Sequence, residues 1–270
     1  MTAPPPEAPD PPLPELSIVV PALDEQDNVG PLVARIEAEM AKAGVRAELI
    51  VVDDGSRDAT LARLKELAAS RPWLRVLHRP QPKGQSSALY AGIHAARAPF
   101  IATLDADLQN DPADLPAMLK TVRDGAADMA QGRRARRRDN LVRKVSSWVG
   151  RTARRLILGD TIRDTGCSTR VLRADIARQL PLQFAGLHRF MPVYVRLLGA
   201  TVVEVPVHHQ PRAAGVTKYG IMNRAIVGLF DCFAVRWMRR RLRSTDCTVI
   251  EHESSRIGEQ QNSKTAEQQI

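Results

Sequence analysis

Apolar residues in the first half of the chain follow two alternating patterns. Short runs rich in Val, Ile and Leu predict buried β-strands, and longer segments with apolar residues three or four positions apart predict amphipathic helices. The strands are expected at 15–21, 47–56, 74–79 and 99–107, and the helices at 28–44, 56–70, 84–97 and 114–125. This alternation is typical of an α/β fold with a mostly parallel sheet covered by helices on both faces.

The second half of the chain has a looser pattern. Its expected elements are a basic helical stretch at 140–158, a turn at 165–167, a helix near 187–198, a strand at 201–209 and a glycine-containing loop at 211–220. No second hydrophobic pattern with its own linker appears, so we expect one globular domain.

The two ends of the chain differ from its middle. Residues 1–15 are rich in proline and 244–270 are polar without a period, which predicts disordered tails around a domain at 16–224. The segment 225–243 is apolar and then basic, so it predicts either a helix at a membrane interface or a core helix with a basic end. No apolar run approaches about 18 residues, so no transmembrane helix is expected.

Charge and cysteine content narrow the function classes. The three cysteines lack C-x-x-C spacing, which argues against a disulfide framework or a cysteine zinc site and favours a reducing compartment. The formal charge is +9, and ten basic residues fall between Arg133 and Arg155. Such a cluster suggests a polyanionic partner: nucleic acid, an anionic lipid surface or a phosphorylated substrate.

Acidic residues stand where the predicted strands end. The first strand ends at Pro21, the second at Asp54, and the fourth runs into Asp105 and Asp107 with Gln109 beyond. Parallel strands bring their carboxyl ends to one edge, where ligands bind in open α/β sheets. In an extended segment, residues two apart share a face. These oxygen ligands therefore predict a Mg²⁺ or Mn²⁺ site that would meet a diphosphate, although D-x-D alone also fits an ordinary turn.

Other ligand motifs fail on spacing. An EF-hand loop starting at Asp105 would need glycine at its sixth position, where the chain has Asn110. The chain after the first strand reads VVPALDEQDN rather than G-x-G-x-x-G, and no G-x-x-x-x-G-K-[ST] occurs. A dinucleotide fold and a P-loop are therefore excluded.

Six motifs taken together resemble those of the family 2 inverting glycosyltransferases with the GT-A fold. Within that family, the chain most resembles the dolichol- or polyprenyl-phosphate hexose (mannose) synthases over roughly residues 15–240. The motifs, in chain order, are VVPALDEQDNV, VVDDGSRDAT, KGQSSALYAGIHAA, TLDADLQNDP, RDTGCSTR and PRAAGVTKYG. The last, R-x-x-G-x-x-K-Y, is the discriminating one, because D-x-D and DDGS occur in many polysaccharide transferases.

The resemblance implies a role for each matching position. The nucleotide base and ribose would be lined by Pro21, Leu23, Glu25, Val52 and Asp54. The metal would be held by Asp105, Asp107 and Gln109, which with Ala106 would also bind the diphosphate-sugar. The phosphates would be bound by Arg134, Arg212 and Lys218, which with Asp107 form the implied catalytic set.

The chain departs from the polyprenyl-phosphate synthases beside the first strand. Position 23 is usually aromatic there and position 24 usually Asn, whereas this chain has Leu23 and Asp24. Base stacking is therefore altered, and the donor remains open between GDP and UDP. Mannose, glucose, galacturonate and aminoarabinose all remain open as the sugar.

The resemblance implies a metal-dependent enzyme that transfers a hexosyl group from a GDP-mannose-like nucleotide-sugar to polyprenyl phosphate with inversion. Its place would be peripheral, on the cytoplasmic face of an anionic membrane, and a small membrane anchor subunit remains an open partner. One alternative keeps the fold and uses a polysaccharide or other glycan acceptor. A remote alternative is nucleic-acid binding through the arginine-rich tract, disfavoured because that tract lacks interleaved aromatic residues.

Overall fold

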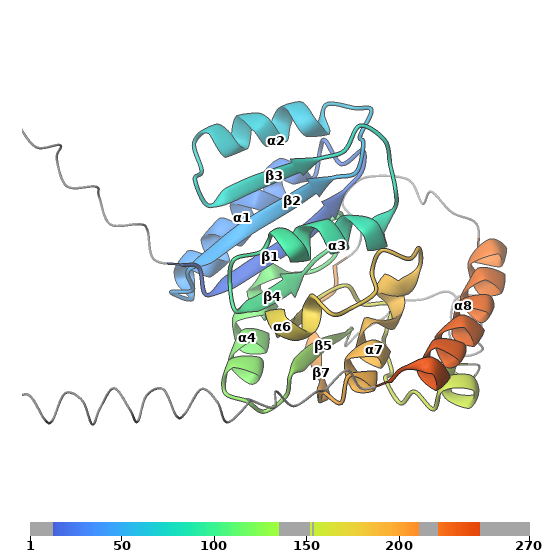
Figure 1. Ribbon diagram of the computed structural model, residues 1–270. Helices are drawn as coiled ribbons and strands as arrows, with labels where there is room; N and C mark the ends of the chain where they lie inside the picture. The colour runs from blue at the N-terminus through green and yellow to red at the C-terminus, as the bar shows by residue number, and fades with distance from the viewer. Residues whose placement is uncertain (1–12, 135–151, 153, 211–220, 244–270) are drawn as a thin grey trace, which may run out of the picture. The chain divides into compact units, whose positions relative to one another are not determined.

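The computed structural model describes residues 13–134, 152, 154–210 and 221–243, with the side chains of 221–227 left aside. Its sheet has seven strands in the order β3-β2-β1-β4-β6-β5-β7, and only β6 runs antiparallel to its neighbours (Figure 1). The strands are β1 Leu16–Ala22, β2 Ala47–Asp53, β3 Leu74–His78, β4 Phe100–Thr103, β5 Met129–Arg134, β6 Arg170–Arg173 and β7 Val202–Val207. A mostly parallel sheet is therefore confirmed.

In the first half of the chain, helices follow the strands in the expected order. The helices are α1 Val29–Lys42, α2 Thr60–Ala69, α3 Gln85–Ala95, α4 Leu115–Arg123, α6 Ala174–Ala177, α7 Met191–Leu197 and α8 Ile221–Arg241, with single 3₁₀ turns η1 Pro112–Asp114 and η2 Leu187–Phe190. Two compact units divide the chain at Met1–Arg236 and Trp237–Ile270, and the first contains the whole sheet. No helix of the described segments is long and apolar enough to cross a membrane.

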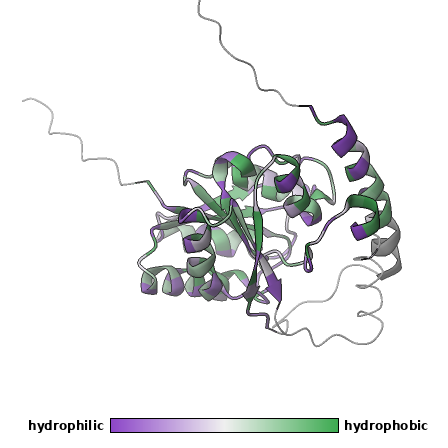
Figure 2. Cartoon of the chain, turned by 90° about the horizontal axis from the view of Figure 1, so that it is seen from below, coloured by the Kyte–Doolittle hydropathy of each residue, from purple (hydrophilic) through white to green (hydrophobic). Residues whose placement is uncertain are grey.

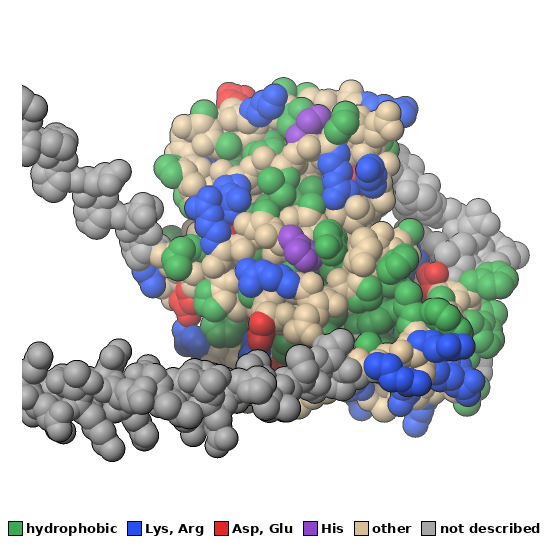
Figure 3. All heavy atoms as spheres, viewed as in Figure 1, with side chains coloured by type: hydrophobic (Ala, Val, Ile, Leu, Met, Phe, Trp, Pro, Cys, Tyr) green, Lys and Arg blue, Asp and Glu red, His purple; other side chains and the backbone are tan. Residues whose placement is uncertain are grey.

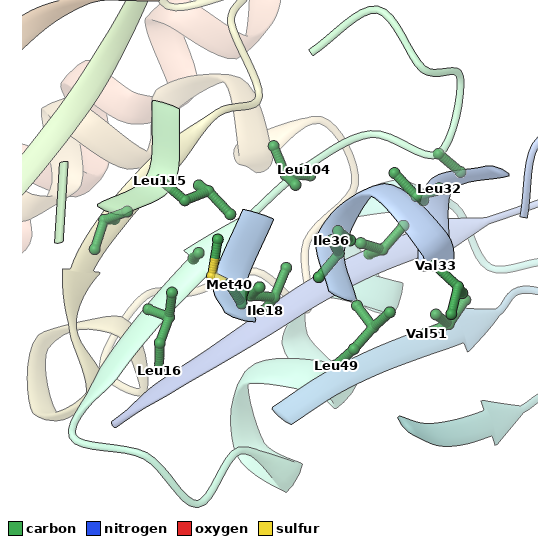
Figure 4. Close-up of a cluster of buried hydrophobic side chains, with 14 of the residues drawn as sticks. Leu16, Ile18, Leu32, Val33, Ile36, Met40, Leu49, Val51, Leu104 and Leu115 are labelled. Atoms are coloured by element: carbon green, nitrogen blue, oxygen red, sulfur yellow. The ribbon is translucent and has the colours of Figure 1, made fainter. Parts of the chain in front are cut away.

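The main hydrophobic core lies where α1 and α4 cover one face of the sheet. Alternate residues of β1 and β2 point into it, and Figure 2 shows apolar colour concentrated on the strands. Leu115 and Met118 bring α4 into the same cluster. Figure 4 shows side chains of α1 over these strands: Leu32, Val33, Ile36 and Met40. This closely packed core holds the carboxyl ends of the strands in fixed positions.

Helix α3 lies very close to the other face. A side chain at Gly92 would place its Cβ 2.3 Å from Val19 Cγ1 and 3.2 Å from Val52 Cγ2, so glycine is needed for this approach. The approach matters for the site because the first residue of α3 is Gln85, which reaches the acidic turn after β4.

Three expected details of the elements were wrong. Strand β4 ends at Thr103 rather than at 107, because the chain turns immediately after it. Strands β5 and β6 were not predicted, since MAQGRR and RVLR lack a clear run of β-branched residues. Both are strands because they complete the sheet beside β4, so a tertiary contact decides what local propensity does not.

Several expectations fall outside the described segments. The 1–12 and 244–270 parts of the expected tails, most of the basic stretch at 140–158, and the 211–220 loop with Arg212 and Lys218 belong there. Glu15, the last residue of the expected N-terminal tail, is described: its N–H donates to the Arg46 carbonyl at 2.7 Å. The domain boundaries at 224 and 243 remain predictions.

Candidate active site

The carboxyl ends of β1, β2 and β4 meet at one edge of the sheet, as expected. Ala22 pairs with Asp53 and Val19 with Thr103, so the loops that follow these strands leave the sheet together. Those loops contain the acidic and polar residues identified in the sequence. A ligand site is therefore expected at this edge of the sheet.

The segment after β4 is a turn rather than an extended chain. Leu108 adopts a left-handed conformation with φ of 60°, and the Gln109 N–H donates to Asp107 Oδ1 at 3.2 Å. The expectation that Asp105, Asp107 and Gln109 share one face as an extended segment is therefore wrong, because that alternation is broken at Leu108. The turn still brings the two carboxylates close together, because the charge of Asp107 raises the pKa of Asp105.

The surroundings of Asp105 disfavour the ionised form of its carboxyl group. Burial raises the pKa of its carboxyl, and the nearby charge of Asp107 raises it further, against the lowering effects of Ser168, Arg170 and Arg134. Its Oδ1 accepts a hydrogen bond from Gln85 Nε2 at 2.8 Å. A divalent cation would stabilise two carboxylates that are held this close together.

The donor chemistry of this turn fits Mg²⁺ or Mn²⁺. Both ions prefer carboxylate and amide oxygens, and both commonly take one or two carboxylates plus substrate phosphates rather than a complete protein cage. Within the described residues, no group of three or more His, Cys, Asp or Glu side chains is arranged to hold a metal. Asp105 and Asp107 therefore match a metal that is completed by a ligand such as a diphosphate.

Arg134 is held by a partner that sequence reasoning missed. Its Nε donates to Asp164 Oδ2 at 2.8 Å, its Nη2 to Asp164 Oδ1 at 2.7 Å, and its backbone N–H to Oδ2 at 3.2 Å. Gly166 makes room for this pair, because a Cβ there would lie 3.1 Å from Arg134 Nη2. Glu204 Oε1 in turn accepts the N–H groups of Arg163 and Asp164. Arg134 is thus a fixed guanidinium near the acidic turn.

The loop after β1 is fastened to the loop after β2. Asp24 has a φ of 51°; its N–H donates to Ser56 Oγ at 2.9 Å and its Oδ1 accepts from the Arg57 N–H at 2.8 Å. The Glu25 N–H donates to Thr60 Oγ1 at 2.8 Å. Aspartate, like the asparagine usual at this position, tolerates the left-handed conformation, so the departure leaves this turn intact. Leu23 and Glu25 are half-buried at this edge.

Three of the expected nucleotide or sugar contacts are buried in the protein. Val52 and Ala106 are core side chains with exposed fractions of 1% and 3%. Asp54 is also buried, and its carboxylate accepts the N–H groups of Lys83 and Gly84 together with Arg79 Nη1. These positions shape the edge from beneath it, whereas Pro21 is half-buried at the end of β1. Their contacts with a nucleotide remain predictions.

The chain approaches the expected phosphate-binding loop beside the acidic turn. The Gln210 N–H donates to the Gln109 carbonyl at 2.8 Å, and Asn110 forms a β-bridge with His209. His208 is paired with Asp114, at 2.8 Å from Nδ1 to Oδ1 and 2.7 Å from its N–H to Oδ2. The residues just before 211 therefore lie against the loop that carries Asp107. Arg212 and Lys218 themselves are outside the described residues.

A second pair at the start of α3 was also missed. Ser86 Oγ lies 2.7 Å from His188 Nδ1, and the His188 N–H donates to the same oxygen at 3.2 Å. This pair joins α3 to η2 directly beside Gln85. The motif KGQSSALYAG marks the segment in the sequence, but its contacts with Asp105 and His188 span 20 and 102 positions. No local pattern gives such contacts.

Comparisons with known proteins identify the family of the chain. The family model "Glycosyl transferase family 2" matches residues 17–180. A dodecaprenyl-phosphate galacturonate synthase of Rhizobium johnstonii is 40% identical over 230 residues, covering 84% of this chain and 68% of that protein. An undecaprenyl-phosphate 4-deoxy-4-formamido-L-arabinose transferase of Edwardsiella ictaluri is 34% identical, covering 77% and 64%. The chain thus spans about two thirds of the length of these relatives.

Solved structures share the fold. Glucosyl-3-phosphoglycerate synthase of Mycobacterium tuberculosis, crystallised with Mn²⁺, UDP and product, has a TM-score of 0.63 at 18% identity and covers 88% of this chain and 84% of its own. A mannosyltransferase of Pyrobaculum calidifontis with GDP-mannose and Mn²⁺ has a TM-score of 0.60 at 15% identity, covering 83% and 65%. The GT-A fold expected from the sequence is therefore confirmed.

Proposed function

The chain belongs to glycosyl transferase family 2, and from this premise we propose that it transfers a glycosyl group from a nucleotide-diphosphate sugar to a polyprenyl phosphate, with inversion. The observation that carries the proposal is the acidic turn at the carboxyl edge of the sheet, where Asp105 and Asp107 lie beside Gln85 and near Arg134. The named relatives support a polyprenyl-phosphate acceptor.

The proposed reaction needs positioning and positive charge more than acid–base chemistry. A polyprenyl monophosphate is largely dianionic near neutral pH, with a second pKa of about 6. Its oxygen attacks the anomeric carbon from the side opposite the nucleoside diphosphate, which leaves as the bond to that carbon breaks. Asp105 and Asp107, with Gln109, would hold a Mg²⁺ or Mn²⁺ that neutralises charge on the leaving diphosphate. Asp164 would keep the Arg134 guanidinium in place for phosphate binding.

Two further cations belong to the proposal by resemblance. Arg212 and Lys218 are proposed to bind the phosphates of donor and acceptor, and the contacts of Gln210 and His209 with the 109–110 segment support a loop that starts beside the acidic turn. Pro21, Leu23 and Glu25 are proposed to line the base and ribose. Asp54 and Val52 would support that surface from within the protein.

The sugar is proposed from the relatives rather than from the site. These relatives are named for the transfer of galacturonate and of 4-deoxy-4-formamido-L-arabinose, and not of mannose. We therefore place UDP-galacturonate ahead of the GDP-mannose-like donor expected from the motifs. A glycan acceptor on the same fold remains the alternative.

Helix α8 is proposed to lie on an anionic membrane surface. Its exposed apolar side chains recur at helical spacing, with exposed fractions of 71% for Phe230, 54% for Phe233 and 61% for Trp237. Figure 3 shows basic side chains gathered at the C-terminal end of α8, and Arg241 lies over the Trp237 ring at 5.7 Å. Aromatic residues beside arginines match the boundary between acyl chains and anionic headgroups. The basic residues in this part are Arg236, Arg239, Arg240, Arg241 and Arg243.

A flotation assay tests the proposed membrane contact. The wild-type chain should float with vesicles containing phosphatidylglycerol and remain below vesicles of phosphatidylcholine alone. Phe233→Ser with Trp237→Ser should weaken flotation without changing the melting temperature, because both side chains are already exposed. Binding that is insensitive to these changes would favour a membrane partner subunit over direct lipid contact.

The cytoplasmic face is proposed because nucleotide-sugar donors and a reducing environment occur there.

A donor and acceptor panel tests the proposed reaction. Labelled UDP-galacturonate, UDP-glucose and GDP-mannose are each incubated with undecaprenyl phosphate and Mn²⁺, and the label is partitioned between water and organic solvent. Label in the organic phase with one donor supports the lipid acceptor and identifies the sugar. Label in a new water-soluble product supports the glycan alternative. Asp128→Asn, at the opposite edge of the sheet, is the matched control and should retain activity.

A further inference from the structure

Arg170 occupies a central position beneath the acidic turn. It begins β6, has an exposed fraction of 2%, and pairs across the strands with Thr103 of β4 and Gln131 of β5. Residues directly opposite each other in antiparallel strands point to the same face. Leu104 and Ala106, on either side of Asp105, belong to the core beneath α1 and α4, whereas Asp105 accepts a hydrogen bond from Gln85 of α3 on the other face. Val171, next to Arg170, is also in that core, so Arg170 and Asp105 lie on the same side of the sheet.

The guanidinium of Arg170 is hydrogen-bonded only to neutral groups within the described part of the chain. Its Nε donates to Gln131 Oε1 at 2.9 Å, its Nη2 to the Thr165 carbonyl at 3.1 Å, and its Nη1 contacts Met191 Sδ at 3.3 Å. The Gln131 Nε2 group is bound to three carbonyls, which fixes its Oε1 toward Arg170. No Arg170–carboxylate ion pair occurs among these residues.

Such a cation is costly unless negative charges lie close by. A buried ion without a contacting counter-charge is unfavourable, and a thioether is a weak acceptor. Burial lowers the pKa of Arg170, while the nearby charges of Asp105 and Asp164 raise it. The Cys167 thiol is also close, but burial raises its pKa and so favours its uncharged form. Asp164 is already engaged by the fork of Arg134. The acidic turn is therefore the remaining source of negative charge that balances Arg170.

We propose that Arg170 is the built-in counter-cation of the Asp105–Asp107 pair, and that it makes divalent-metal binding depend on the nucleotide diphosphate. This inference rests on the proposed function of the site. Arg170 is a positioning residue in this account, because it acts on the metal through the two carboxylates. With Arg170 in place, a metal ion arriving alone finds a partly balanced pair. A diphosphate brings the additional negative charge that the metal needs.

The coupling must be reciprocal. If the nucleotide strengthens metal binding by a given factor, the metal strengthens nucleotide binding by the same factor. Removing the charge of Arg170 should therefore tighten the binding of metal alone and reduce the coupling. Changing the shape of Arg170 while keeping its charge should leave both nearly unchanged.

Mn²⁺ binding to the full chain, followed by electron paramagnetic resonance with and without UDP or GDP, tests this assignment. Arg170→Gln removes the charge and keeps an amide that can donate a hydrogen bond, whereas Arg170→Lys keeps the charge and loses the fork. Arg170→Gln should bind Mn²⁺ alone about tenfold more tightly than the wild type, and Arg170→Lys should stay within about twofold. With nucleotide present, the three proteins should differ less.

Equal affinities of folded Arg170→Gln and wild type for Mn²⁺ alone would overturn the assignment and leave the proposed function intact. If Arg170→Gln does not fold, the wild type decides. Its Mn²⁺ affinity should rise at least about tenfold with nucleotide, and equal affinity with and without nucleotide would overturn the assignment. If the wild type binds neither nucleotide nor Mn²⁺ under any condition, the proposed function fails together with the inference.

Discussion

Two carboxylates at opposite edges of the sheet, buried Glu48 and half-buried Asp105, have pKa values that are shifted in opposite directions. Glu48, near the amino end of β2, accepts hydrogen bonds from Ser17 Oγ at 2.6 Å, the Arg97 N–H at 2.7 Å and Arg75 Nη1 at 3.0 Å. Burial raises its pKa, but these donors outweigh burial and the pKa lies below the ordinary value of 4.5. Asp105, at the carboxyl edge, has a raised pKa because burial and Asp107 prevail.

The difference separates a structural carboxylate from a functional one. At the amino edge, the fold supplies every donor that Glu48 needs, so the ionised form stabilises the folded state. At the carboxyl edge, the charge of Asp107 and burial together outweigh the nearby cations and raise the pKa of Asp105. Strongly perturbed groups of the second kind are typical of functional sites. Removing each group should therefore have opposite consequences for activity and stability.

The largest expected effect is on activity, at Asp107. Asp107→Asn keeps the shape of the side chain and removes the proposed metal ligand, so glycosyl transfer should fall by at least about 10³-fold, or roughly 4 kcal/mol in the barrier. The melting temperature should not fall. Initial rates and thermal denaturation of the same preparation measure both. Transfer at a wild-type rate would remove Asp107 from the mechanism.

At the amino edge, the expected effect is on stability alone. Glu48→Ala removes the buried carboxylate that binds both Arg75 and the Ser17 hydroxyl. The free energy of unfolding should therefore fall by about 3 kcal/mol. Urea denaturation monitored by circular dichroism measures the change. The transfer rate of the remaining folded protein should be unchanged, and a specific loss of rate would break the comparison.

The pH dependence of Glu48 has a definite sign. Because its pKa is lowered on folding, its ionised form contributes stability above the unfolded value of 4.5, and that contribution is lost as the pH falls through the folded pKa. Glu48→Gln should therefore be less stable than the wild type at neutral pH. The difference in unfolding free energy should shrink below about pH 4.5, as measured by urea titrations at a series of pH values.

Asp164 should give an intermediate effect on activity. Asp164→Asn breaks the charged fork that orients Arg134, so kcat/KM should fall by roughly 10- to 100-fold while the fold is retained. KM for the donor and kcat are measured separately. A misplaced Arg134 should change how the donor is bound, whereas a purely structural effect should change only the amount of folded enzyme. Asp128→Asn is the control. Unchanged kinetics of Asp164→Asn would show that the fork is only structural.

The smallest expected effect is a gain in stability at Asp105. Asp105→Asn removes the repulsion from Asp107 and the cost of burying a charge, but it also removes the attraction to Arg170 and Arg134. Because the pKa of Asp105 is raised overall, the first two effects prevail, and the apo protein in EDTA should become more stable by about 1 kcal/mol. Thermal or urea denaturation tests this. A loss of stability similar to that of Glu48→Ala would contradict the distinction between the two edges.

The sequence was sufficient for the alternating strands and helices because those signals are local. It also marked Asp105 and Asp107 as candidate metal ligands, because both come soon after a buried strand, and that assignment remains a prediction. It gave the wrong conformation for the segment after Thr103, because nothing in the residue types marks Leu108 as left-handed. Strands β5 and β6 were not predicted, because they are strands through pairing with their neighbours in the sheet rather than through their composition.

The partners within the site were beyond sequence reasoning for a different reason. Gln85 meets Asp105, Ser86 meets His188 and Arg134 meets Asp164 across separations of 20, 102 and 30 positions. A single sequence carries no direct signal for such contacts. Arg170 was read as part of the motif RDTGCSTR, yet its burial and neutral partners appear only in the folded chain.

The central claim is that the carboxyl edge of the sheet uses a divalent metal to transfer a sugar to a lipid phosphate. The most direct measurement follows label from the nucleotide-sugar into the organic phase, with wild-type enzyme stripped of metal by EDTA and then supplied with Mn²⁺. The account predicts that label stays in water after stripping and enters the organic phase once Mn²⁺ is restored. Equal transfer into the organic phase in both conditions would contradict it.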